Sequence, residues 1–285
     1  EVFEEVDSAL GQNLYKIMVN GPDSELTLTA NTQPALMAVS LAIARVLEKE
    51  FNINFKNKAS YLAGHSLGEY SATCVAGVFS LSDTAKLLRI RGEAMQQAVP
   101  VGVGGMAAVL GLSFEDVSAL VDACNDASHY CVAANDNSDG QVVLSGHIQA
   151  IEKAVEMAAE FGAKKCLRLP VSAPFHSPLM QPAAEVMARA FMDIDAHNAQ
   201  IPIIANVSAA PETEKKEIIK NLIDQVTGTV RWRETMTFFC ENGITDIVEL
   251  GAGKVLSGIA KKSLKDINSF SVYSIQEIED LAKNL

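Results

Sequence analysis

Apolar residues recur at helical spacing through much of the first hundred positions. In residues 1–10 a large apolar side chain returns every fourth position, which predicts an amphipathic helix. A longer helix is predicted over residues 35–50, beginning at Thr32-Gln33-Pro34, because proline is favoured in the first turn. A further helix, capped by Ser82-Asp83, is predicted to run to about residue 99.

From residue 106 the pattern changes to short apolar runs that alternate with amphipathic segments. The predicted order is strand, helix, strand, strand, helix, strand, over residues 106–110, 114–126, 130–134, 141–145, 148–161 and 165–169. This βαββαβ order is that of the ferredoxin-like split unit. Residues 135–140 are rich in Asn, Asp, Ser and Gly, which predicts a loop between the middle strands.

Other short apolar runs predict strands around the helical segments. These runs are residues 59–63, 201–206, 244–250 and 271–275, with further helices predicted over 67–76, 212–220, 234–242 and the C-terminal residues. Strands and helices therefore alternate on both sides of the ferredoxin-like segment, which predicts an α/β protein with an inserted subdomain.

The turn between residues 59–63 and 67–76 reads Gly-His-Ser-Leu-Gly around Ser66. Gly-x-Ser-x-Gly between a strand and a helix is typical of a nucleophile elbow. Such a turn exposes the serine Oγ and places the N–H of Leu67 at a helix N-terminus, where a negative oxygen is stabilised. The alternative is a serine that only caps the helix. The flanking elements favour Ser66 as a nucleophile.

Two further residues stand out beside Ser66. Arg91 shares a helix face with Leu87 and Met95, so its guanidinium either meets a carboxylate or extends to solvent. His176 lies between Pro174 and Pro178 in a short loop that the prolines stiffen. The other histidines lie in polar stretches, at a helix start or beside Ser66, so His176 is the candidate base.

Composition narrows the function classes. The chain has 285 residues, 48% of them hydrophobic, and a net charge of −12, which disfavours nonspecific nucleic-acid binding. No apolar run reaches the length of a membrane span, and no basic, apolar leader opens the sequence, so we expect a cytoplasmic protein. Five widely spaced cysteines predict free thiols and no metal site. Gly-Ala-Gly-Lys at 251–254 lacks the spacing of a P-loop.

Six sequence blocks, taken in order, resemble the acyltransferase family of fatty-acid and polyketide synthesis, in particular the malonyl-CoA:acyl carrier protein transacylases. The blocks are Gly-His-Ser-Leu-Gly-Glu-Tyr, Ile-Arg-Gly-Glu-Ala-Met-Gln, Asn-x-Ser-x-Gly-Gln-Val-Val-Leu-Ser-Gly, Pro-Phe-His-Ser, Val-Arg-Trp and Glu-Leu-Gly-Ala-Gly-Lys-Val-Leu. The resemblance extends from residue 1 to about 275. It implies an α/β-hydrolase-like large domain (residues 1–103 and 172–285) with an inserted ferredoxin-like subdomain (residues 104–171).

The resemblance also implies roles for four residues. Ser66 would take the malonyl group from coenzyme A as an ester, and His176 would be its base and then the acid for the leaving thiolate. The N–H of Leu67 would be one donor of the oxyanion hole. Arg91 would bind the free malonyl carboxylate in a bidentate ion pair, which gives its place on an apolar face a reason.

Other positions that match the family are expected around the substrate. These are Gln33, His65, Asn137 and Phe175, and the bulk of Phe175 would crowd an α-methyl group. The histidine would be oriented by a backbone carbonyl from the Val-Arg-Trp stretch, at Arg231. The implied partners are malonyl-CoA and acyl carrier protein, with no cofactor beyond the coenzyme A thioester, no nucleic acid and no membrane. We expect a monomer.

One family feature is missing. The family begins with a strand and a Pro-Gly-Gln-Gly-Ser-Gln loop some 30 residues before the equivalent of Glu1, and this loop supplies the second oxyanion donor. We expect that the natural protein has these residues; the alternative is a catalytically impaired protein that binds carrier protein.

A serine hydrolase or thioesterase is a third hypothesis, which needs an acid between Ser66 and His176. The aspartates in that interval lie at caps, in helices or in polar turns: Asp83, Asp116, Asp122, Asp126, Asp136 and Asp139.

By the resemblance, the carrier protein is acidic, so an enzyme of charge −12 needs a local basic patch to bind it. Two clusters are candidates, although both can also be ordinary solvated side chains: Lys164, Lys165 and Arg168, or Lys261, Lys262 and Lys265.

Overall fold

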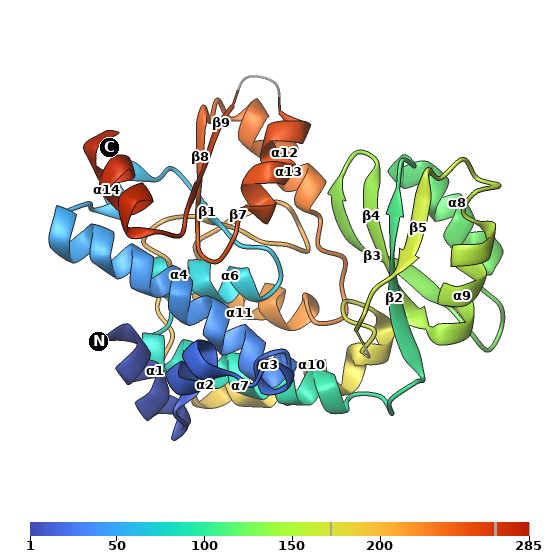
Figure 1. The fold of residues 1–285 in the computed structure, drawn as a ribbon, viewed down its shortest axis with the longest axis horizontal. Coiled ribbons are helices and arrows are strands. Elements are labelled where there is room, and N and C mark those ends of the chain that lie inside the picture. Colours follow the sequence, from blue (N-terminus) through green and yellow to red (C-terminus); the bar gives the residue numbers. More distant parts are fainter. Residues whose placement is uncertain (172, 265–266, 285) are drawn as a thin grey trace.

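The computed structural model describes residues 1–171, 173–264 and 267–284, which form a larger and a smaller unit side by side (Figure 1). The larger unit combines the N-terminal helices with the elements that follow residue 173. The smaller unit, drawn in green at the right of the view, is a four-stranded sheet with two helices. Because Lys265 lies outside the described residues, only Lys261 and Lys262 of its cluster are placed.

Helices build the first part of the larger unit: α1 (Val2–Leu10), α2 (Leu14–Asn20), α3 (Asp23–Leu26), α4 (Thr29–Phe51), α5 (Phe55–Lys58), α6 (Leu67–Val75) and α7 (Leu81–Gln97). The predicted helix over residues 1–10 is confirmed, and its apolar face is buried at Val2 and Val6. Two predicted helix starts are wrong. Helix α4 begins at Thr29 and contains Pro34, while Ser80, not Ser82-Asp83, caps α7 by accepting a bond from the Asp83 N–H at 3.0 Å.

The strands of the larger unit are short. β1 (Leu62–Ala63) is parallel to β6 (Ile203–Ile204), which pairs antiparallel with β7 (Pro211–Glu212). β8 (Asp246–Leu250) is parallel to β9 (Asn268–Val272). The four predicted strands therefore exist, but β1 and β6 are shorter than their apolar runs and β9 begins before its run. Apolar side chains of β1, β6 and β8 belong to one hydrophobic cluster, which includes Ala63, Ile204 and Ile247.

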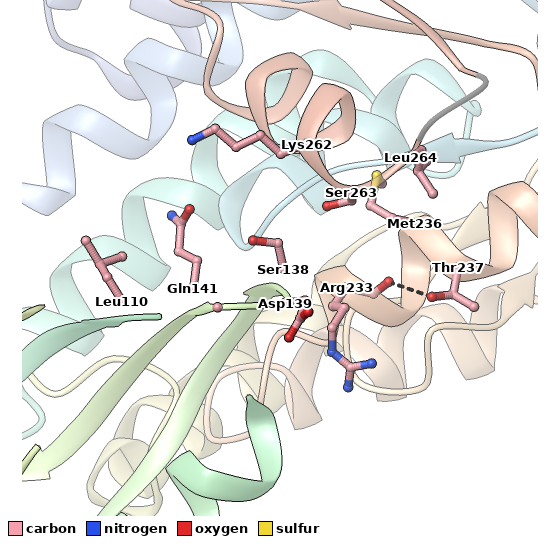
Figure 2. A pocket seen from close by; sticks show the side chains of 11 residues that line it. Leu110, Ser138, Asp139, Gln141, Arg233, Met236, Thr237, Lys262, Ser263 and Leu264 are labelled. Carbon is pink, nitrogen blue, oxygen red and sulfur yellow. Dashed lines mark hydrogen bonds between the residues drawn. The ribbon is translucent and has the colours of Figure 1, made fainter. Parts of the chain in front are cut away.

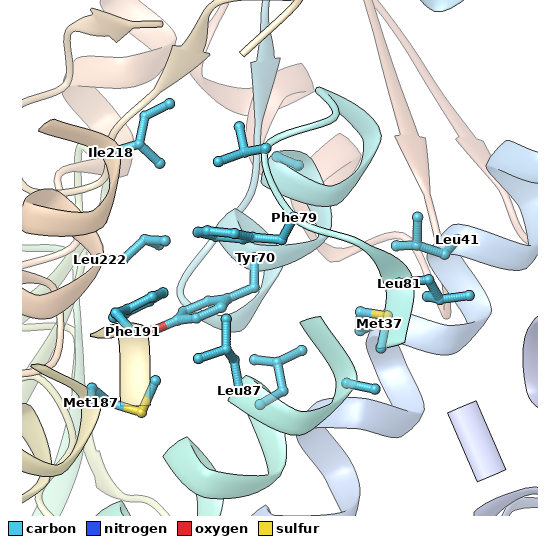
Figure 3. Packing of buried hydrophobic residues seen from close by; sticks show 14 of the residues in the cluster. Met37, Leu41, Tyr70, Phe79, Leu81, Leu87, Met187, Phe191, Ile218 and Leu222 are labelled. Carbon is cyan, nitrogen blue, oxygen red and sulfur yellow. The ribbon is translucent and has the colours of Figure 1, made fainter. Parts of the chain in front are cut away.

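The main core lies among the helices below these strands. Figure 3 shows Tyr70 of α6 among Phe79, Leu87 and Phe191, and the rings of Tyr70 and Phe191 stack with centroids 6.2 Å apart. The remaining elements of the larger unit are η1 (Pro178–Met180), α10 (Gln181–Ala190), η2 (Phe191–Asp193), α11 (Lys215–Asp224), α12 (Trp232–Glu241), α13 (Val255–Ser263) and α14 (Ile275–Asn284). Since Tyr70 follows the predicted nucleophile by four residues, this core fixes the helix that carries the elbow.

The smaller unit has the predicted βαββαβ order: β2 (Gly104–Leu110), α8 (Phe114–Cys124), β3 (Cys131–Ser138), β4 (Gln141–His147), α9 (Ile148–Met157) and β5 (Lys165–Arg168). All its neighbouring strands are antiparallel, in the spatial order β3-β4-β2-β5. Its own apolar core lies between the sheet and the two helices. The exact domain boundaries stay a prediction, and Ser172, where the second one falls, lies outside the described residues.

The predicted loop over residues 135–140 is wrong for its first four residues. They extend β3, with irregular register at two points, and their side chains are buried. The reason is a neighbouring segment: the Asp136 N–H donates to the Val230 carbonyl, and the Val230 N–H donates to the Ala134 carbonyl, each at 2.9 Å. Polar residues that usually form turns are thus held in a strand between the two units.

Candidate active site

Ser66 lies at the turn between β1 and α6, as the elbow motif predicts. Its backbone has φ 53° and ψ −113°, a conformation that L-residues rarely adopt and that often marks functional sites. A Cβ on Gly64 would lie 1.9 Å from the Gly68 carbonyl oxygen, so only glycine fits there. Leu67 is the first residue of α6, and its N–H therefore belongs to the positive end of the helix.

His176 is the partner of Ser66. The Ser66 Oγ lies 2.7 Å from His176 Nε2, and His176 Nδ1 lies 2.8 Å from the Gln225 carbonyl oxygen. Because a carbonyl only accepts, Nδ1 carries the proton and Nε2 is free to accept one from Ser66. Burial, together with the nearby Arg91 cation, lowers the pKa of His176 to about 3. The imidazole is therefore a neutral base at neutral pH.

The carbonyl that orients His176 corrects one prediction. We expected it at Arg231, but it belongs to Gln225. The Arg231 carbonyl instead accepts the Thr235 N–H at 3.0 Å, because Arg231 caps the N-terminus of α12. A carbonyl at the His176 Nδ1 position also leaves no place there for the acid that a Ser-His-Asp hydrolase would use.

Arg91 reaches the same site from α7. Only 1% of the residue is exposed. Its Nη2 donates to Ser66 Oγ at 3.1 Å and to Gln225 Oε1 at 2.8 Å. Its Nη1 donates to Gln33 Oε1 at 2.7 Å. All three acceptors are neutral, so a substrate carboxylate would be a stronger hydrogen-bond partner for this buried cation.

The remaining predicted residues also gather near Ser66. His65 Nε2 and Asn137 Oδ1 lie 2.8 Å apart, so these two side chains bond to each other and join the elbow to β3. The His65 ring meets Trp232 edge to face, with centroids 5.5 Å apart. Phe175, next to His176, is half-buried and packs against apolar clusters of both units.

Three residues that the sequence did not single out also belong to the site. Asn206 Oδ1 accepts the Ser66 N–H at 2.7 Å, and its Nδ2 donates to the Gly64 carbonyl at 2.8 Å. Gln225 contributes its carbonyl and both ends of its side-chain amide, and Glu69 accepts from Gln225 Nε2 at 2.6 Å. The signal for Asn206 was its position at the end of a predicted strand. Gln225 follows a charged helix and gave no signal.

A separate pocket of about 470 Å³ lies where the turn between β3 and β4 faces α12 and α13 (Figure 2). Ser138, Arg233 and Lys262 are among its lining residues, whereas Ser66, His176 and Arg91 are not. Over the described ranges, no helix is long and apolar enough to span a membrane. In the same part of the chain, no group of three or more His, Cys, Asp or Glu residues could hold a metal ion.

Comparison with known proteins gives the family. Residues 2–281 match the acyl transferase domain. The chain is 42% identical over 277 residues to the malonyl CoA-acyl carrier protein transacylase of Haemophilus influenzae, covering 96% of this chain and 87% of that protein. The corresponding Bacillus subtilis protein is 42% identical over 281 residues, covering 98% and 86% of the two chains.

Solved structures agree with these relatives. The acyl-carrier-protein-S-malonyltransferase of Bartonella henselae has a TM-score of 0.96 and 51% identity, covering 99% of this chain and 90% of that one. A malonyl-transacylase solved in complex with its type II polyketide synthase acyl carrier protein has a TM-score of 0.93 and 35% identity, covering 100% and 90%. Sequence, fold and the Ser66–His176 geometry thus agree, and the chain belongs to the acyl transferase family, among the malonyl CoA-acyl carrier protein transacylases.

Proposed function

We propose that this enzyme moves the malonyl group of malonyl-CoA to the phosphopantetheine thiol of acyl carrier protein, through an ester on Ser66. The observation that carries the proposal is the position of Ser66 Oγ, 2.7 Å from the base His176 and 3.1 Å from the buried cation Arg91. A nucleophile between a base and a cation suits an acyl group that bears a free carboxylate.

In the first half-reaction, His176 Nε2 takes the proton of Ser66 as Oγ attacks the thioester carbonyl. The Leu67 N–H faces the developing oxyanion. The carbon–sulfur bond then breaks, and the coenzyme A thiolate takes the proton from His176. In the second half-reaction the carrier thiol gives its proton to His176 and attacks the ester, the carbon–oxygen bond breaks, and Ser66 regains the proton. The proposed reaction uses no cofactor beyond its thioester substrate.

The same proposal extends to organisation and location. We assign residues 1–103 and 172–285 to the large domain and 104–171 to the subdomain, and we assign contacts with the substrate to Gln33, His65, Asn137 and Phe175. We also propose a monomer in the cytoplasm. All five cysteines are free thiols, which supports a reducing compartment.

The test is covalent labelling with malonyl-CoA followed by mass spectrometry. We expect one malonyl group on Ser66 and none on a Ser66→Ala variant. Transfer of this label to added carrier protein supports the transacylase; loss to free malonate at the same rate with and without carrier supports a hydrolase instead. No label on the unaltered enzyme would refute the proposal.

A second test addresses the substrate class. Arg91→Ala should reduce acylation of Ser66 by malonyl-CoA at least about a hundredfold more than acylation by acetyl-CoA, since only malonyl carries the carboxylate. Arg89→Ala is the control on the same helix, because Arg89 bonds Gln12, outside the site. Equal losses for the two substrates in Arg91→Ala would remove Arg91 from carboxylate binding.

A further inference from the structure

Glu69 is a buried carboxyl in the elbow helix, three residues after Ser66, and the proposed mechanism does not use it. Only 1% of the residue is exposed. Its Oε2 accepts from Gln225 Nε2 at 2.6 Å and from the Asn206 backbone N–H at 3.2 Å. Both partners hold the site: Asn206 binds the Ser66 N–H, and Gln225 contacts Ser66, His176 and Arg91. Glu69 thus contacts both of the residues that hydrogen-bond to the backbone of Ser66.

The side-chain amide of Gln225 has a direction, and the carboxyl of Glu69 and the Ser66 carbonyl hold its Nε2 end, at 2.6 and 3.0 Å. An amide has a donating and an accepting end, whereas Oε2 of Glu69 accepts two N–H bonds. The Nε2 of Gln225 therefore faces Glu69, and its Oε1 faces Arg91 Nη2 at 2.8 Å. In the reversed orientation, oxygen would face oxygen at Glu69 and N–H would face the guanidinium at Arg91. Both contacts would be repulsive in a buried site.

The charges around Glu69 are consistent with this role. Burial raises the pKa of Glu69 to about 7, against the opposing effects of its bonds and of Arg91. The neighbouring titratable groups are Arg91 on α7 and Tyr70 on the same helix. When the carboxyl is neutral, Oε2 is the oxygen that stays without a proton, because two donors already face it. The amide of Gln225 therefore keeps its direction in both protonation states.

We propose that Glu69 is a positioning residue that acts through the side-chain amide of Gln225 to hold Arg91 for the substrate carboxylate. This inference rests on the proposed function, because it assigns Arg91 the carboxylate of the acyl group. It separates two tasks of Gln225: the backbone carbonyl orients the base, and the side-chain amide, which Glu69 helps to hold, orients the cation.

Glu69→Met tests the inference, because methionine has a similar length but no comparable acceptor, so the Nε2 end of the Gln225 amide loses the group that holds it. We expect kcat/KM for Ser66 acylation to fall about ten- to hundredfold with malonyl-CoA and to change less than about threefold with acetyl-CoA. A purely structural role would lower both equally. Glu249→Met is the control, because Glu249, like Glu69, accepts two N–H bonds, here from the backbone of Leu256 and Ser257, outside the site.

Gln225→Met is the second variant, since replacing a buried carboxyl can itself unfold the chain. It keeps the backbone carbonyl on His176 but removes the whole side-chain amide, with its bonds to Glu69, Arg91 and the Ser66 carbonyl, so acylation should fall more with malonyl-CoA than with acetyl-CoA. The double variant should lose no more than the larger single loss, as expected when two residues act through one link. Equal losses for both substrates, additive losses, or an unchanged malonyl preference in Gln225→Met would each overturn the inference. Absence of malonyl label on the unaltered enzyme would instead refute the proposed function.

Discussion

The imidazole of His176 bonds to a backbone carbonyl, and the buried cation Arg91 lies in the same site. A carboxylate partner would stabilise a protonated histidine, whereas a neutral carbonyl beside a cation does so much less. The site is therefore arranged to keep the base neutral until the hydroxyl proton of Ser66 arrives.

We predict that the rate of Ser66 acylation by acetyl-CoA has no midpoint near pH 6.5, the ordinary pKa of histidine. The base must be neutral to accept a proton, and a pKa lowered to about 3 keeps His176 neutral well below that pH. The rate should be flat from pH 8 to 5 and fall only at lower pH. Single-turnover measurements by mass spectrometry test this, and acetyl-CoA avoids any titration linked to the carboxylate site. A twofold loss centred near pH 6.5 would contradict the prediction.

At the scale of elements, the elbow depends on how closely the end of β1 approaches the start of α6. We predict that Gly64→Ala destabilises the fold by about 3 kcal/mol or more, because its Cβ would lie 1.9 Å from a backbone oxygen that cannot move alone. Gly68→Ala, in the same motif, has no atom within 4 Å of its Cβ and should be neutral or slightly stabilising in a helix. Thermal unfolding of both variants tests this. Similar melting temperatures would show that the end of β1 and the start of α6 are less closely packed than in the structure.

Site residues could be predicted from the sequence only where the pattern that marks them lies within a few neighbouring positions. Ser66 could be identified because a glycine-flanked turn is visible within a few residues; Arg91 stood out on its apolar helix face, but only the family resemblance gave it a role. Gln225 could not be identified, because its contacts with Ser66, Glu69 and Arg91 cross more than 130 positions of sequence. The misassigned loop at 135–140 has the same cause. Its turn-forming residues become strand only because the backbone at Val230 pairs with them.

At the scale of the whole molecule, polar contacts of β3 join the two units. Asn137 bonds His65 of the elbow, and Asp136 pairs with Arg233 of α12 through three contacts of 2.8–3.1 Å. The Asp136 side chain is 1% exposed, and that of Arg233 is 35% exposed. Burial raises the pKa of Asp136, and Arg233 opposes that rise. The charge of Asp136 is therefore tolerated in the interface because Arg233 accompanies it.

We predict that Arg233→Leu lowers the free energy of unfolding at pH 7 by about 1–3 kcal/mol, because it leaves a buried carboxylate without its donors. Without Arg233 the pKa of Asp136 rises further, so the carboxyl is protonated as the pH falls, and the loss should shrink between pH 7 and 5. Arg231→Leu is the control, since Arg231 pairs with Glu234 at the surface, where a pair contributes about 1 kcal/mol or less. Urea unfolding at both pH values measures the difference. If Arg231→Leu costs as much as Arg233→Leu, or if the loss does not change with pH, Asp136 is not the charge that Arg233 stabilises between the two units.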